Sequence, residues 1–157
     1  MKIFYFFAIT LILNSCNSDE PENCCAVVDT DITIKYINES GENLLDGENS
    51  INFTDIKVFH KIGSEWKEYF KGNLDNPKGL TTVEINGEKF LRIFVSTEVN
   101  QNQISETKLK FSDNDIDIIK TELNLSANNT IVTKVWYDDN LEWDMNDNTT
   151  RQFIIVK

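Results

Sequence analysis

The chain has 157 residues, of which 26 are acidic and 15 basic, and its formal net charge is −11. So acidic a surface repels the phosphate backbone, which excludes nucleic acid as a partner. The length fits a single domain. His60 is the only histidine, and no nucleophile-elbow, phosphate-loop or zinc-protease motif occurs. We therefore expect no enzymatic activity and no resident cofactor.

The first residues of the chain have the pattern of an export signal. Lys2 precedes an apolar run over residues 3–13 that only Thr10 interrupts. This run is shorter than the roughly 20 residues of a membrane-spanning helix, but it suits the apolar region of a signal peptide. Residues 1–15 are therefore predicted to be a removable signal peptide.

The segment Leu13-Asn14-Ser15-Cys16 resembles a bacterial lipobox. The resemblance implies cleavage before Cys16, a diacylglyceryl group on its sulfur and usually a third acyl chain on the new amino terminus. Two or more acyl chains make membrane anchoring effectively permanent. The alternative is an ordinary secreted protein in which Cys16 pairs with Cys24 or Cys25; in the lipoprotein, these two adjacent cysteines are expected to be free thiols of the tether.

The residues after the lipobox carry an acidic signature. Ser18, Asp19, Glu20 and Glu22 resemble the export signal that sends lipoproteins of Bacteroidota to the outer face of the outer membrane. The resemblance implies a lipid-anchored protein at the cell surface, with the periplasmic face of the outer membrane as the alternative. Residues 16–26 would then be the lipidated cysteine and an acidic tether.

Residues 27–157 show the pattern of a β domain. Apolar and polar residues alternate over residues 32–36, 56–62, 91–95 and 141–145, as in strands with one buried face, and residues 153–156 form an almost continuous apolar strand. Asn86-Gly87 lies between two such runs and predicts a type I′ hairpin turn. Regular turn signals between roughly eight to ten short strands predict an antiparallel β-sandwich.

Residues 112–123 permit two interpretations. Ser112 could cap a helix with Ile116, Ile119 and Leu123 on one face, or the segment could be a strand. We favour the strand, because the neighbouring segments are strand-like.

A calcium-binding loop has its first ligands at positions 1, 3 and 5, which are occupied here by Asp113, Asp115 and Asp117. The positions that need glycine and the bidentate glutamate hold Ile118 and Asn124 instead. Calcium at these aspartates is therefore a subsidiary hypothesis, and solvated turns are the simpler interpretation.

Trp136, Tyr137 and Trp143 surround Asp138-Asp139-Asn140 and could form a platform for a sugar ring. The strand phase argues against all three rings being exposed. Trp143 is in register with Leu141 and Met145, which predicts that these three side chains are buried. Because neighbours on a strand face opposite sides of the sheet, either Trp136 or Tyr137 must also point inward.

In its general pattern the domain resembles the small β-sandwich lipoproteins of Bacteroidota, which implies an immunoglobulin-like or related Greek-key sandwich. The prediction is a non-enzymatic, membrane-anchored binding or structural module of the cell envelope, with an envelope protein or a glycan as its partner. The alternative is a small-ligand module that binds glycan or calcium through its loops.

Overall fold

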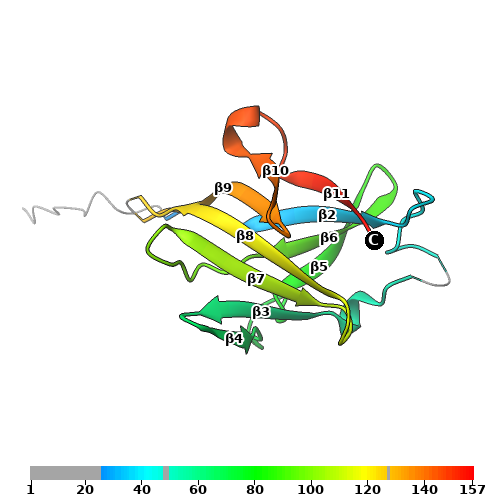
Figure 1. The fold of residues 1–157 in the computed structure, drawn as a ribbon, viewed down its shortest axis with the longest axis horizontal. Helices are drawn as coiled ribbons and strands as arrows, with labels where there is room; N and C mark the ends of the chain where they lie inside the picture. Colours follow the sequence, from blue (N-terminus) through cyan, green and yellow to red (C-terminus); the bar gives the residue numbers. More distant parts are fainter. Residues whose placement is uncertain (1–25, 48–49, 127) are drawn as a thin grey trace, which may run out of the picture.

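The computed structural model describes residues 26–47, 50–126 and 128–157. These residues form two β-sheets packed face to face, with the sheet of β9, β8, β7 and β3 in front of the sheet of β2, β6 and β5 (Figure 1). The predicted β-sandwich is confirmed. The predicted signal peptide, Cys16, the acidic export signal and Cys24-Cys25 lie outside the described residues.

In the described part of the chain, sheet A has seven strands and sheet B has four. Sheet A runs in the order β1 (Val28–Asp29), β9 (Thr130–Tyr137), β8 (Ile116–Asn124), β7 (Ile104–Lys110), β3 (Lys57–Ile62) and β4 (Glu65–Glu68), and β10 (Asn140–Asp144) pairs with β9. Sheet B runs in the order β11 (Gln152–Val156), β2 (Asp31–Ile37), β6 (Glu88–Phe94) and β5 (Leu80–Ile85). Two short 3₁₀ helices, η1 (Phe53–Asp55) and η2 (Met145–Asp147), lie in the connections.

The segment for which the sequence permitted a helix or a strand is strand β8, as predicted. Asp117, Ile119, Thr121 and Leu123 are buried, and the residues between them are not. This alternation of two places one face of β8 against sheet B, where it joins a continuous apolar core.

Two strand pairs are parallel, although the sequence predicted antiparallel pairing. β1 pairs with β9, and β11 pairs with β2. Near each end of the domain the chain passes from sheet A into sheet B, from β1 to β2 and from β10 to β11. A strand that arrives by such a crossover is not bound by the antiparallel geometry of a hairpin.

The predicted hairpin between β5 and β6 is confirmed, since Asn86 and Gly87 have φ angles of 54° and 81°. A second turn of this kind joins β9 to β10. There Asp138 and Asp139 have φ angles of 43° and 69°, a conformation that few residues other than glycine adopt.

Trp143 is buried as predicted, with 7% of its surface exposed, but the residues in register with it are not. Leu141 is 54% exposed and Met145 45% exposed. The register of β10 against β9 shifts between Leu141 and Trp143, which breaks the alternation, and Met145 already belongs to η2. The predicted burial of Leu141 and Met145 was therefore wrong.

Arg151 fixes the place where the chain changes sheets. Its guanidinium donates to both carboxylate oxygens of Asp29, at 3.0 and 2.9 Å, and to the carbonyl oxygen of Asp31 at 2.7 Å. The same group lies 4.9 Å from the ring centroid of Trp143. Because only 12% of the Arg151 side chain is exposed, these bonds are poorly screened by water.

We expect Arg151→Lys to lower the free energy of unfolding by about 2 kcal/mol, because an ammonium group cannot span both Asp29 oxygens and the Asp31 carbonyl. Arg92→Lys is the matched control: Arg92 pairs with Asp31 at 3.3 Å, but its side chain is 41% exposed. The control substitution should lower the free energy of unfolding by only about 0.5 kcal/mol. Urea unfolding measures both, and equal losses would contradict the role of Arg151.

Candidate functional site

A cavity of about 660 Å³ opens at one end of the sandwich, where β3 and β6 end and β2 and β9 begin. We call it the end pocket. Its size falls within the usual range of ligand sites, about 300–1,000 Å³. Its walls come from both sheets and the adjoining loops: Val28, Thr30, His60, Ile62, Tyr69, Lys71, Leu74, Asp75, Asn76, Gly79, Phe94, Val95, Thr97, Glu98 and Thr130.

One wall of the end pocket is a stack of two rings. The His60 imidazole lies on the Tyr69 ring with 4.4 Å between centroids. Tyr69 is held there because Gly79, at φ 71°, leaves room for it: a Cβ at residue 79 would lie 2.9 Å from Tyr69 Cδ1. The wall is thus set by local backbone geometry before any ligand is present.

His60 is uncharged in this wall. Burial lowers the pKa of its imidazole from 6.5 to about 4, and the nearby charge of Lys71 acts in the same direction, whereas a hydrogen bond with the Phe94 main chain opposes both. The Nε2 atom is buried and has no hydrogen-bond partner among the described residues.

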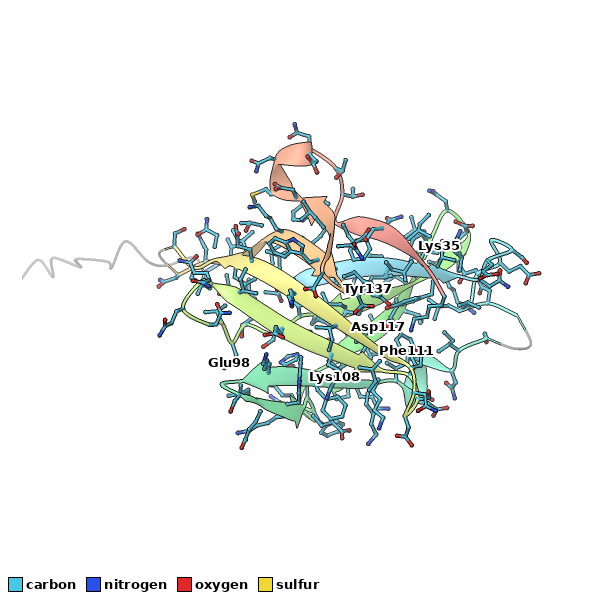
Figure 2. The ribbon with its side chains drawn as sticks, viewed as in Figure 1. Lys35, Glu98, Lys108, Phe111, Asp117 and Tyr137 are labelled. Carbon is cyan, nitrogen blue, oxygen red and sulfur yellow. The ribbon has the colours of Figure 1, made fainter. Side chains whose placement is uncertain are left out.

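The rim of the end pocket is polar and exposed. Thr97 and Glu98 follow β6, and Figure 2 shows Glu98 on a loop at one end of the sandwich, with Phe111 toward the other end. Lys71 and Asp75 add charges of opposite sign, while Leu74 is an exposed apolar residue in the same loop. An apolar interior with a mixed polar rim is typical of a binding site.

Acid should destabilise the protein through His60. Because its pKa is depressed in the folded state, the unfolded chain takes up the proton first, and stability is lost as the pH falls from about 6.5 toward 4. We expect a loss of about 2 kcal/mol after allowance for partial exposure of the ring.

His60→Phe keeps a ring against Tyr69 and cannot titrate. Urea unfolding at pH 7 and pH 4.5 should show a smaller acid-induced loss for this variant than for the wild type. Equal losses would mean that His60 titrates normally.

Comparison of the chain with protein families, with curated proteins and with solved structures finds no match in any of the three. Over residues 26–47, 50–126 and 128–157, no helix is long and apolar enough to cross a membrane.

The sequence did not single out the end pocket. His60 was noted only as a lone histidine, although its phase was informative: Val58, two residues earlier on β3, is buried. The other walls come from segments far apart in the chain, and their meeting depends on the order of the strands.

The three aspartates of the calcium hypothesis have partners within the protein. Asp113 pairs with Lys110 at 2.6 Å, and Asp115 and Asp117 both pair with Lys157, Asp117 at 2.8 Å. A cation there would have to displace these lysines. The described residues hold no group of three or more metal-ligating side chains. Calcium binding stays a prediction.

Asp117 is buried, with 4% of its surface exposed, which the sequence did not predict. Its carboxylate accepts a hydrogen bond from the Tyr36 hydroxyl at 3.2 Å and another from Tyr137. Burial raises the pKa of this carboxyl group, and the contacts with Lys157 and the tyrosines oppose that rise. The arrangement joins β8 and β9 of sheet A to β2 of sheet B, and is therefore structural.

The three aromatic residues of the sugar hypothesis do not share a face. Trp143 is buried, and its Nε1 donates to the Thr149 carbonyl oxygen at 3.1 Å. Tyr137 also points inward, with its ring centroid 6.4 Å from that of Tyr36. Trp136 is half-buried on the opposite side of β9 and faces outward.

Proposed function

We propose that this protein is a non-enzymatic, lipid-anchored envelope module that binds a small, mostly apolar ligand in the end pocket. The observation that carries the proposal is the cavity of about 660 Å³ between the two sheets, with aromatic and aliphatic walls and a polar rim.

The chemistry of the walls supports an uncharged ligand body. Ile62, Phe94 and Val95 present apolar surface, and Tyr69 presents a ring. The threonine hydroxyls and the charged residues of the rim would orient a polar end. The charges at the rim are of both signs, so they favour no strongly charged ligand.

The state of His60 supports binding rather than catalysis. A general base must reach the proton that it removes, at about 2.6–3.2 Å. The Nε2 atom of His60 is enclosed beside the Tyr69 ring, and the imidazole binds protons weakly.

The position of β1 connects the pocket with the predicted anchor. Val28 and Thr30 line the end pocket, so the chain enters the described fold beside the ligand site. Val28 is the twelfth residue after Cys16, a reach of at most about 40 Å. A lipidated Cys16 would keep the pocket within that distance of the membrane surface.

Filling the pocket should abolish ligand uptake. The probe is Nile red, an uncharged dye whose fluorescence rises in apolar surroundings. We expect Thr97→Trp to reduce the dye signal at least tenfold, because Thr97 is exposed and lines the cavity. Gln101→Trp is the matched control, since it adds the same side chain to the same connection outside the cavity. If the dye does not bind the wild type, or binds both variants alike, the pocket proposal fails.

The anchor is tested separately in cells that express the full chain. Palmitate labelling should be lost in Cys16→Ala, and protease added to intact cells should digest the wild-type domain. A variant with Ser18, Asp19, Glu20 and Glu22 replaced by Ala should keep the label but become protected. Persistent labelling of Cys16→Ala would refute lipidation, and protection of the wild type would place the domain on the periplasmic face.

A further inference from the structure

We propose a second binding site, on the outer face of sheet A, that takes an uncharged oligosaccharide. One row of side chains runs across this face from strand to strand: Trp66, Lys61, Glu106, Lys120, Trp136 and Leu141. The site is independent of the end pocket, which lies between the sheets.

The row faces away from the core. Its neighbours along the strands, such as Thr107, Ile119 and Val135, are fully buried, so alternation directs the row outward. Trp66 and Trp136 stand four strand spacings apart, about 19 Å at 4.8 Å per strand. Two indoles at that separation suit an extended chain of sugars rather than a single ring.

Beside Trp66 the surface is hollowed, and Trp136 lies outside the lining of this hollow. The hollow has a volume of about 450 Å³ and is lined by Trp66, Lys61, Glu106, Ile118, Lys120, Asp138 and Asp139. It thus combines one aromatic wall with groups that donate and accept hydrogen bonds.

Most charges of the hollow are paired within the protein. Lys61 pairs with Glu106 at 2.6 Å, and Lys120 pairs with Asp139. Although the whole chain carries −11, the lining of the hollow carries a formal charge of only −1, from two lysines and three carboxylates. A ligand rich in hydroxyls but without charge matches it, because hydroxyls can donate to the carboxylates and accept from the ammonium groups.

Both sides of the hollow are held in place. Lys108, which lies on the face of sheet A toward the viewer in Figure 2, places its Nζ 4.7 Å from the ring centroid of Trp66 and 4.6 Å from that of Phe59. On the other side, the Asp138 carboxylate accepts from the Ile118 amide at 3.0 Å. Asp138 and Asp139 both have the positive φ of the hairpin turn between β9 and β10, which fixes the position of their side chains. Preorganised groups lose less entropy when a ligand binds.

The test uses the complete mature domain and purified hexasaccharides of glucose, mannose, galactose and xylose, with titration followed by calorimetry and tryptophan fluorescence. We expect at least one neutral hexasaccharide to bind, and Trp66→Ala to raise its Kd about tenfold or more. Glu106→Gln, which keeps the size of the side chain, should also weaken binding. Phe70→Ala is the control, because Phe70 is an exposed aromatic residue outside the hollow.

Each other outcome overturns the proposal. No binding of any neutral hexasaccharide excludes the site, and unchanged affinity in Trp66→Ala places the sugar elsewhere. Tighter binding of a polygalacturonate oligomer than of neutral sugars would refute the uncharged class. Thr97→Trp should leave sugar affinity unchanged; if it weakens binding as much as Trp66→Ala, the sugar occupies the end pocket. Unchanged circular dichroism of Trp66→Ala separates loss of binding from loss of fold.

Discussion

The sandwich depends on the contact between the Arg151 guanidinium and the short segment that leads from β1 to β2. Asp29 belongs to sheet A and Asp31 to sheet B. The planar guanidinium of Arg151 donates hydrogen bonds to the Asp29 carboxylate and to the Asp31 carbonyl oxygen. An unpaired charge in this half-buried position would be costly, so the contact specifies where the chain leaves one sheet and enters the other. The parallel pairing of β1 with β9 and the placing of Val28 and Thr30 on the pocket wall both follow from that crossing point.

The two ends of the sandwich are built differently. At the end far from the pocket, Lys157 reaches Asp117 and lies 3.9 Å from the ring centroid of Phe111, which in turn packs edge-on against Tyr36 at 5.3 Å. Aromatic rings and an ion pair fill the space between the sheets there. At the opposite end the space between the sheets stays open, bordered by Thr30, Thr97 and Thr130 and by the loop that joins β4 to β5. A rigid closed end and an open end make a scaffold that can hold a ligand without rearranging its core.

The outer face of sheet A shows how an acidic protein can present a neutral surface. Three of its lysines, Lys61, Lys120 and Lys134, stand opposite glutamates in neighbouring strands, as in the pair of Lys134 with Glu122 at 3.5 Å. Such exposed pairs contribute little to stability. Their physical effect is local: they cancel the field of the remaining carboxylates while leaving many hydrogen-bond donors and acceptors exposed. The end pocket and this face are therefore two surfaces of different chemistry on one domain.

Local structure could be predicted from the sequence alone. The β-sandwich, the Asn86-Gly87 turn and the burial of Trp143 followed from alternation and turn chemistry, which act over a few residues. The strand within residues 112–123 was favoured over a helix because its neighbours are strand-like. Features that depend on strand order and register emerged only in the folded arrangement. A one-residue shift in β10 exposed Leu141, and the two chain crossings produced parallel strand pairs. The burial of Asp117 and its hydrogen bond with Tyr36 across the two sheets also depend on this arrangement. The end pocket belongs to the same class, because its walls come from residues 28 to 130 and no short stretch of sequence contains them. Such features depend on the pairing of strands that are far apart in the sequence, and the local pattern of apolar and polar residues does not specify that pairing.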